Sequence, residues 1–383
     1  MSSRKTIWIL LPVLVALSFC ETKKTEGSGS ENVKEPGIRL NTIVSNQEII
    51  WGMDWLPNGE LLFTEKRGKL YRFSGGKTTE ITGVPDVNTN GQGGLLDIKV
   101  HPDYNTNGWI YCSYAGYDNS RYGVLTLIRF KLKGNTITNT ETLLKASTPD
   151  MWFGHYGSRI VFDKAGMLYL SIGEGGPTSY GGANSPNMNA QNAKVEWGKI
   201  HRMTADGKVP ADNPILPGNS GPTTVFSYGH RNPQGLALNP ATGEIWEDEH
   251  GPRGGDEVNI IRKGRNYGWP LVSFGINYDG NPVTDKPTRP GIEAPVHTWT
   301  PSIAPCGMAF ITGERYKGWK GNILVGSLAF RHLTRLQVEG DKVVKETKML
   351  NDIGRVRNVK MGPDGYIYIS VEGPGRILQL IPE

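Results

Sequence analysis

The chain has 383 residues and a formal net charge of +5, with 50 glycines, 25 prolines, ten tryptophans and 15 tyrosines. This turn-rich, aromatic composition, with few helical patterns of polar and apolar residues, favours a β protein with scarce helix and ample apolar material for a core. Lysine and arginine are interleaved with acidic residues and form no basic stripe, so we expect no nucleic-acid partner.

The first 20 residues are typical of a secretory signal. A basic start precedes an apolar run from Ile7 to Phe19, which is too short to span a bilayer comfortably. We therefore predict a signal peptide over 1–20 and an exported protein, periplasmic or on the outer surface. The tetrapeptide that ends at Cys20 resembles a bacterial lipobox, although Phe19 is not the small residue expected there. The sequence agrees with two alternatives, a lipid attached at Cys20 or ordinary cleavage of the signal peptide. The lipid would be the protein's only expected contact with a membrane.

Residues 21–37 are charged, contain Gly and Ser, and hold almost no apolar side chains, so we predict a disordered tether. The remainder, 38–383, is predicted to be one catalytic domain. Its two cysteines, Cys112 and Cys306, show no metal-type spacing. A disulfide in an oxidising compartment and two buried thiols both agree with the sequence.

A strand-turn-strand unit recurs six times along this domain. Each copy has an apolar strand, a turn of the type Pro/Asp-x-x-Gly, and a second strand with aromatic or Leu residues. The copies occupy residues 51–66, 95–116, 158–174, 234–249, 307–328 and 356–372. Most continue into a third strand of alternating apolar and polar residues, at 69–73, 125–132, 198–203, 257–261, 333–338 and 376–381. Each unit is thus a small antiparallel meander.

Six meanders predict an all-β fold, a six-bladed β-propeller of four-stranded antiparallel blades, which leaves few exposed strand edges. The last copy has three clear strands, and Arg39 to Ser45 is a spare strand at the other end, so we predict that it completes the last blade. A pair of β-sandwiches, the rival architecture, would not need six matching turns. The longest insertions, 173–197 and 267–303, are expected to wall in a site.

The densest group of polar residues is the loop 248–257, which holds four acids, a histidine, an arginine and a Gly-Pro pair. Such a loop between strands suggests a site on a scaffold, and a solvated loop with internal ion pairs is the alternative. The carbonyl and carboxylate oxygens around Gly251 and Pro252, with Tyr267 downstream, are hard ligands that suit Ca²⁺. In the alternative without a cation, Arg253 pairs with the acids.

His155 stands before an expected inner strand, in the aromatic sequence Phe-Gly-His-Tyr-Gly. A histidine whose neighbours exclude water suits a general base, because its pKa lies near working pH. A merely structural histidine is the alternative.

Arginines recur before inner strands: Arg231 in one blade, and Arg355 and Arg357 in the last. Because inner strands converge on the propeller axis, these side chains and Gln92 are expected to form a positive funnel for a small, planar, multiply charged anion. In the alternative, they pair between blades with acids of the loop 248–257, namely Asp248, Glu249 or Asp256.

Eight motifs that follow one another in order carry a family resemblance. They are GQGGLLDIKVHPDY (91–104), GHYGSRIVFD (154–163), GKIHRM (198–203), YGHRNPQGLA (228–237), EHGPRGGDEVN (249–259), GRNYGWP (264–270), PSIAPCGMAF (301–310) and GRVRNVKMGPDG (354–365). Together they resemble the soluble quinoprotein sugar dehydrogenases of the glucose/sorbosone dehydrogenase family, and look closest to its aldose sugar dehydrogenase branch. The resemblance covers almost everything after Ile38.

This resemblance implies a six-bladed propeller that holds pyrroloquinoline quinone (PQQ) over its central mouth, with Ca²⁺ on the quinone side. Carried over by position, the catalytic base is His155 and the residue beside it is Gln92. Three further groups are similar to the family's cofactor contacts: Arg231 and Asn232 beside the reactive carbonyls, Arg355 and Arg357 on the carboxylates, and Ser302 as the hydroxyl contact. The Gly251 and Pro252 carbonyls would ligate the cofactor's Ca²⁺, and Glu257 with Tyr267 a second, structural one.

The function implied is a PQQ- and Ca²⁺-dependent oxidoreductase that oxidises the anomeric hydroxyl of aldoses to lactones, with an unknown electron acceptor, as a monomer or homodimer. Two positions depart from the glucose-type enzymes: Gly154 replaces an Asp before the base, and Ala329 stands near the place of a fifth-blade Lys. Base orientation must then come from elsewhere, with one fewer cation on the cofactor. The alternatives are a non-catalytic secreted propeller that binds a glycan or protein, and a Ca²⁺-dependent lactonase with carboxylates around its axis.

Overall fold

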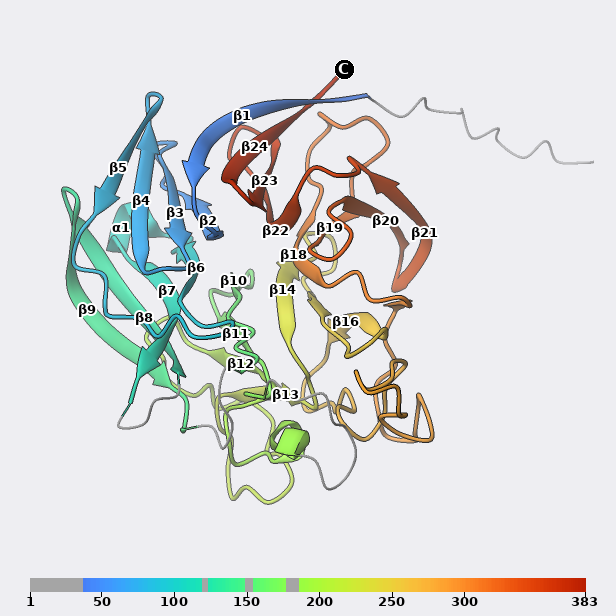
Figure 1. Ribbon diagram of the computed structural model, residues 1–383. Helices are drawn as coiled ribbons and strands as arrows, with labels where there is room; N and C mark the ends of the chain where they lie inside the picture. The colour runs from blue at the N-terminus through green and yellow to red at the C-terminus, as the bar shows by residue number, and fades with distance from the viewer. Residues whose placement is uncertain (1–36, 119–122, 149–153, 177–185) are drawn as a thin grey trace, which may run out of the picture. The chain divides into compact units, whose positions relative to one another are not determined.

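The computed structural model describes residues 37–118, 123–148, 154–176 and 186–383 (Figure 1), which lie within a compact unit over Glu35–Glu383. The predicted signal peptide, the possible lipid site at Cys20 and almost all of the predicted tether lie outside the described residues and stay predictions. Among the described residues, no helix has the length and apolar character needed to cross a membrane.

Six four-stranded antiparallel sheets form a six-bladed β-propeller, as predicted. Each blade is named here by its innermost strand. The β2 blade contains β2 (Ile50–Trp55), β3 (Leu61–Glu65), β4 (Lys69–Ser74) and β5 (Lys77–Ile81). The β6 blade contains β6 (Leu95–Val100), β7 (Ile110–Tyr117), β8 (Gly123–Lys133) and β9 (Thr136–Lys145). The β10 blade contains β10 (Ile160–Phe162), β11 (Leu168–Ile172), β12 (Lys199–Met203) and β13 (Val225–Tyr228).

The other three blades follow the same order from the inside outward. The β14 blade contains β14 (Pro233–Leu238), β15 (Ile245–Glu249), β16 (Asp256–Ile261) and β17 (His297–Trp299). The β18 blade contains β18 (Pro305–Phe310), β19 (Ile323–Ser327), β20 (Leu333–Glu339) and β21 (Lys342–Met349). The described helices are α1 (Tyr104–Asn107) and the 3₁₀ helix η1 (Pro186–Gln191), so helix is scarce, as expected.

The last blade joins the two ends of the domain. It contains β22 (Arg355–Met361), β23 (Ile367–Glu372) and β24 (Gly375–Pro382), with β1 (Ile38–Gln47) as its outer strand. Strand β1 pairs antiparallel with β24. The prediction that an N-terminal strand completes the last blade is therefore confirmed.

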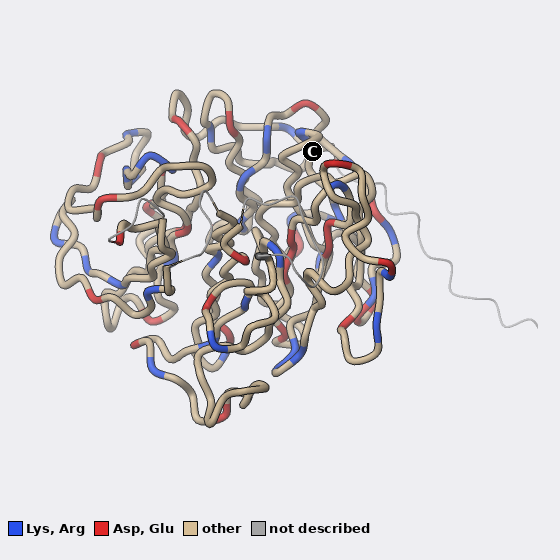
Figure 2. Tube along the Cα trace, turned by 60° about the horizontal axis from the view of Figure 1, so that its bottom comes forward, with Lys and Arg blue, Asp and Glu red and all other residues tan. Residues whose placement is uncertain are grey.

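The core lies between neighbouring blades, where both faces of the inner strands are covered. All five residues of β3 are buried, and the same is true of β11, because a neighbouring blade packs on each side. The innermost strands approach one another closely. A Cβ atom at Gly52 of β2 would lie 2.8 Å from the backbone of β6, so this contact requires glycine. Figure 2 shows basic and acidic residues interleaved along the chain, as the sequence indicates.

Arg159 connects the blades at the propeller axis. It precedes β10 and is 3% exposed. Its guanidinium donates hydrogen bonds to the innermost strands of all five other blades: to the carbonyls of Gln234 (2.7 Å), Trp51 (3.3 Å) and Arg357 (2.6 Å), to the Asp97 carboxylate (3.3 Å), and to the Cys306 sulfur (3.6 Å). It also stacks 4.0 Å from the centre of the Trp51 ring. One side chain thus fixes the spacing of six strand ends.

The two cysteines are free and buried thiols. Cys112 lies in β7, where burial raises its thiol pKa well above the ordinary value. Cys306 lies on the axis beside Arg159 and donates to the Arg357 carbonyl over 3.1 Å. Of the two alternatives that the sequence left open, the structure has two buried thiols.

Replacing Arg159 with Met is expected to lower the free energy of unfolding by about 3–5 kcal/mol, because it leaves the buried Asp97 carboxylate without its counterion. Urea denaturation followed by tryptophan fluorescence measures this. Arg67→Met is the control, since Arg67 forms a surface ion pair with Glu48, and it should cost less than about 1 kcal/mol. Equal losses in the two variants would contradict the role given to Arg159.

Candidate active site

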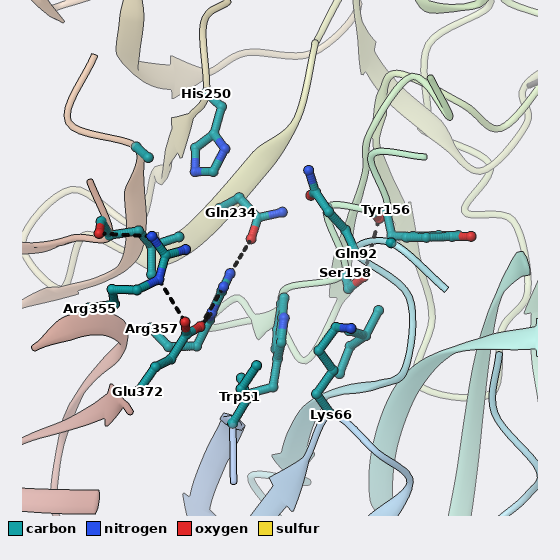
Figure 3. Close-up of a pocket in the computed structure, with 16 residues that line it drawn as sticks. Trp51, Lys66, Gln92, Tyr156, Ser158, Gln234, His250, Arg355, Arg357 and Glu372 are labelled. Carbon is teal, nitrogen blue, oxygen red and sulfur yellow. Dashed lines mark hydrogen bonds and ion pairs between the residues drawn. The ribbon is translucent and has the colours of Figure 1, made fainter. Parts of the chain in front are cut away.

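A cavity of about 320 Å³ opens beside Arg159 at the hub of the propeller (Figure 3). It is lined by the starts of innermost strands and the loops before them, and by residues at the ends of second strands, such as Lys66, His250 and Glu372. The polar and aromatic side chains in its wall are those of Trp51, Lys66, Gln92, Tyr156, Ser158, Gln234, His250, Arg355, Arg357 and Glu372. Its volume is in the range of small-molecule and cofactor sites. Three of the predicted residues, Gln92, Arg355 and Arg357, meet in this wall.

Arg355 and Arg357 share one carboxylate. Their Nε atoms donate to the two oxygens of Glu372, over 2.8 Å and 2.7 Å. Burial opposes ionisation of Glu372, but the charge of Arg357 and these hydrogen bonds outweigh it and lower its pKa. Neither arginine pairs with the loop 248–257, so the alternative of pairing with Asp248, Glu249 or Asp256 is wrong for these two.

Lys66 faces these arginines from the other side of the cavity, with Trp51 between them (Figure 3). Its ammonium donates to the Thr89 carbonyl over 3.2 Å, and no carboxylate of the described residues lies within 4 Å. Burial lowers the pKa of Lys66, and the charge of Arg357 adds to this effect. Three cations and one carboxylate, Glu372, leave the cavity wall with two positive charges.

His250 lines the cavity as a neutral side chain. Its Nε2 lies 2.9 Å from the Pro305 carbonyl, so this nitrogen carries the ring proton and donates it. Burial lowers the pKa of His250 well below its usual value, and the charge of Arg231 lowers it further. The ring therefore adds no positive charge to the cavity wall.

Asn232 lies directly behind the cavity and positions Gln92. Its Nδ2 donates to Gln92 Oε1 over 3.2 Å, while its Oδ1 accepts from the Gly157 N–H (3.2 Å) and from Gln234 (3.0 Å). Asn232 is fully buried. The structure therefore joins the predicted Asn232 to the cavity through Gln92 and Gln234.

His155 is held by Glu174, at the end of the hairpin that follows it. Its Nδ1 lies 2.9 Å from both carboxyl oxygens, which fits one ring N–H shared between them and leaves Nε2 as the proton acceptor. Burial, and then the charge of Arg231, lower the pKa of His155 well below its usual value. Burial raises the pKa of Glu174, against the opposing charge of Arg231.

The surroundings of Gly154, the residue before His155, require a glycine. A Cβ atom there would lie 2.0 Å from the Gly175 carbonyl oxygen. The two segments are also bonded through the His155 N–H and the Gly176 carbonyl over 3.0 Å. Close backbone packing therefore excludes a side chain before His155, and Glu174 from the facing segment orients the ring.

Arg231 lies between His155 and the predicted calcium ligands. Its Nη1 donates to the His250 carbonyl (3.0 Å) and to the Gly251 carbonyl (2.7 Å), and its guanidinium lies over Trp269. Its backbone N–H, not its guanidinium, contacts Glu249 (2.6 Å). Arg231 is 3% exposed and sits behind the cavity wall.

The predicted calcium ligands surround a second, very small cavity of about 10 Å³, close to the size of one water or ion. Gly251, Glu257 and Tyr267 line it, whereas Pro252 lines a larger neighbouring cavity. The Tyr267 hydroxyl donates to the Ile260 carbonyl over 2.5 Å and accepts from the Arg262 N–H over 2.8 Å, so it already has two partners. These oxygen donors fit a hard cation.

Two other expectations are settled by position. Arg253 is exposed and has no carboxylate of the described residues within 4 Å, so the alternative in which it pairs with the loop acids is wrong. Ser302 donates to the Asp256 carboxylate over 2.7 Å and lines the neighbouring cavity with Pro252. The structure does not bring Ser302 into the wall beside Arg355, and its contact with a cofactor stays a prediction.

Sequence reasoning missed several residues of the site: Lys66, Glu174, Gln234, His250 and Glu372. One of them had a usable signal. In the hairpin of β22 and β23, Arg355 lies directly opposite Glu372, so the register of this repeat pairs opposite charges. The contact between His155 and Glu174 depends on a loop approach that strand periodicity does not encode.

Comparison with known proteins agrees with this geometry. A family model described as glucose/sorbosone dehydrogenase matches residues 47–379. The aldose sugar dehydrogenase YliI of Escherichia coli strain K12 is 37% identical over 341 residues, which cover 87% of this chain and 90% of that protein.

Solved structures are similar over nearly the whole domain. A glucose dehydrogenase structure is 39% identical with a TM-score of 0.83, covering 89% of this chain and 99% of that chain. The PQQ-bound form of an aldose sugar dehydrogenase from Streptomyces coelicolor is 27% identical with a TM-score of 0.71, covering 91% of this chain and 100% of that chain. The chain therefore belongs to the glucose/sorbosone dehydrogenase family.

Proposed function

We propose that this protein is a sugar oxidoreductase that uses PQQ and Ca²⁺ to oxidise the anomeric hydroxyl of aldoses to lactones. The observation that carries the proposal is the hub cavity, whose wall bears two net positive charges, next to the buried pair of His155 and Glu174. The relatives named as aldose sugar and glucose dehydrogenases support it. The electron acceptor is unknown. The same proposal includes export of the protein, with or without a lipid at Cys20, and a monomeric or homodimeric state.

The cavity suits PQQ in charge and in shape. PQQ is a planar molecule with three carboxylates, and when bound it supplies the quinone carbonyl that accepts hydride from the sugar. Arg355 and Arg357 would hold its carboxylates from one side, where Glu372 keeps their guanidiniums in place. Gln92, fixed by Asn232, would add a hydrogen bond from another wall.

Lys66 would supply the cation that the family's fifth-blade Lys provides elsewhere. Ala329 carries no charge and lines the neighbouring cavity, whereas the ammonium of Lys66 faces the hub cavity without a carboxylate partner among the described residues. Its lowered pKa reflects burial and the repulsion of Arg357, and both would be offset by an anionic ligand. The cofactor would then contact as many cations as in enzymes with the fifth-blade Lys, but one of them would come from a different blade.

His155 would act as the general base. Its Nε2 takes the proton of the anomeric hydroxyl while the C1 hydrogen leaves as hydride and the carbon–oxygen double bond of the lactone forms. Because its pKa is low, the ring is neutral and ready to accept this proton at neutral pH. Glu174 holds the ring through Nδ1 and stabilises the imidazolium that forms.

Ca²⁺ would bind at the Gly251 and Pro252 carbonyls, with a second, structural ion at Glu257 and the Tyr267 carbonyl. The Gly251 carbonyl accepts from Arg231, so the guanidinium would lie next to the ion. The Arg231 guanidinium and the Ca²⁺ would together stabilise the negative charge that the cofactor gains when it accepts hydride. Ser302 would contribute only if it leaves Asp256.

Reconstitution tests the proposal directly. Apoprotein given PQQ and Ca²⁺ is expected to reduce an artificial dye when an aldose is added, and His155→Ala should lower kcat by about 100-fold to 10,000-fold while PQQ still binds. The measurements are dye absorbance and quenching of tryptophan fluorescence by PQQ. Bound PQQ without dye reduction by any aldose would favour the non-catalytic alternative.

The pH dependence of kcat/KM follows from the His155 pair. Because the pKa of His155 is below its usual value, the rate should be constant above about pH 6.5 and fall only at lower pH as the ring protonates. Glu174→Gln removes the charge that stabilises the imidazolium, so we expect about 100-fold lower kcat and an acid limb at still lower pH. Glu141→Gln, in a surface ion pair, is the control. An acid limb that stays in place in Glu174→Gln would argue for a structural role only.

The role of Lys66 is tested by cofactor affinity. Lys66→Met should weaken PQQ binding about tenfold or more, equivalent to about 1.4 kcal/mol, and Lys66→Arg should restore most of it. The control is Lys69→Met, because Lys69 lies in the same hairpin but pairs with Glu80 on the surface. Fluorescence titration with PQQ gives the Kd values. An unchanged Kd in Lys66→Met would leave the sugar dehydrogenase proposal intact and remove Lys66 from it.

A further inference from the structure

The β14 blade contains a buried cluster that the proposed chemistry does not use. His230, Glu247 and Glu249 converge there, and one ligand atom from each lies within 4.8 Å of the others. His230 Nδ1 is 3.6 Å from an oxygen of Glu247 and 3.6 Å from an oxygen of Glu249. The histidine and Glu247 are completely buried, and Glu249 is 4% exposed. We refer to these three residues as the His230 cluster.

Polar atoms of the His230 cluster lack partners. Neither His230 Nδ1 nor Glu247 Oε2 has a hydrogen bond, although both are buried. Burying such atoms without a partner is costly, and native proteins rarely do it. A separation of 3.6 Å is too long for a hydrogen bond, but it is close to the roughly 3.4 Å between two ligand atoms that bind one tetrahedral metal ion at about 2.1 Å.

Each member of the cluster is oriented by a hydrogen-bond partner outside the cluster, as metal ligands are. His230 Nε2 lies 2.9 Å from the Ser227 hydroxyl, and the ring stacks on Tyr267 with centres 4.6 Å apart. Glu247 Oε1, the oxygen 3.6 Å from His230 Nδ1, accepts from Asn259 over 2.8 Å, and Glu247 Oε2 has no partner. Glu249 Oε2 accepts from the Arg231 N–H over 2.6 Å, which leaves its Oε1 to face the histidine.

The cluster places two carboxylates against one histidine. Burial lowers the pKa of His230, but hydrogen bonds and charges from Glu247 and Glu249 outweigh burial and raise this pKa to about 9. Glu247 and Glu249 form no ion pair with a lysine or arginine of the described residues, and Glu257 lies nearby on the same Asn259 amide at 3.1 Å. Burial, and then the charge of Glu249, raise the pKa of Glu247 to about 7. A divalent cation would neutralise this charge and occupy the unpartnered atoms at once.

The geometry points to a structural site for a divalent transition-metal ion, of the Zn²⁺ or Mn²⁺ type, bound by His230 Nδ1, Glu247 and Glu249. An imidazole nitrogen beside carboxylates suits these ions better than Ca²⁺, which prefers oxygen donors alone. Its ligands differ from those of the proposed calcium sites at Gly251, Pro252, Glu257 and Tyr267, and it adjoins them, because Glu249 also lines the small cavity at Gly251. It would tie the loop before β14 to β15, and it stands independently of the proposed sugar oxidation.

Metal binding by the whole protein tests this inference. The chain is freed of metal, incubated with ZnCl₂, MnCl₂ or CaCl₂ separately, and passed through a gel-filtration column before its metal content and melting temperature are measured. We expect about one Zn²⁺ or Mn²⁺ per chain with a raised melting temperature. His230→Gln and Glu247→Gln should each weaken binding at least tenfold, and Ser227→Ala about tenfold, since it removes only the orienting hydroxyl.

His297→Gln is the matched control, because His297 faces Glu346 in a half-buried pair far along the chain from the cluster. It should bind Zn²⁺ or Mn²⁺ like the unmodified protein. Absence of Zn²⁺ and Mn²⁺ uptake, tighter binding of Ca²⁺ at the same residues, or uptake unchanged in both Glu247→Gln and Ser227→Ala would overturn the inference. PQQ binding, measured in parallel, shows whether the hub cavity is intact in each variant.

Discussion

The guanidinium of Arg159 is the interaction on which the hub depends. It is rooted next to β10 and bonds to the innermost strands of the five other blades. An arginine suits this place because its planar fork offers five donors in fixed directions. The same bonds fix the backbone at Trp51, Gln234 and Arg357, and these residues line the cavity. The spacing of the blades and the shape of the cavity therefore have one common cause.

The cavity is positive because its charges come from separate strand ends that the ring brings together. Arg355 and Arg357 belong to one blade and share Glu372, whereas Lys66 comes from another and has no such partner among the described residues. Such a site attracts a ligand with several negative groups more than it stabilises the protein itself. The repulsion between these positive charges lowers the stability of the fold, and in return the binding surface is preformed, as is common at functional sites.

Sequence reasoning recovered the parts of the molecule that repeat. Six turns of one type predicted six blades, and a spare strand near Arg39 predicted how the ring closes, because strand alternation and turn chemistry are local properties. Gln92, Arg355 and Arg357 were placed correctly in one cavity since each stands near the start of an innermost strand. Glu174 and Lys66 were missed because their positions depend on how separate loops approach one another. Ser302 was expected in the same cavity, but its hydroxyl is bonded to Asp256, a contact that spacing along the chain does not reveal.

The pairing of β1 with β24 has a consequence for biosynthesis. These strands stand at opposite ends of the domain, and the Glu383 N–H donates to the Gly37 carbonyl over 2.9 Å. The ring cannot close before β24 has been made, so β1 waits without its partner strand while the earlier blades form. Contacts of such long sequence separation fold slowly. A chain that ends before β24 would leave β1 and β23 without the strand that lies between them, so both would keep unpaired backbone edges.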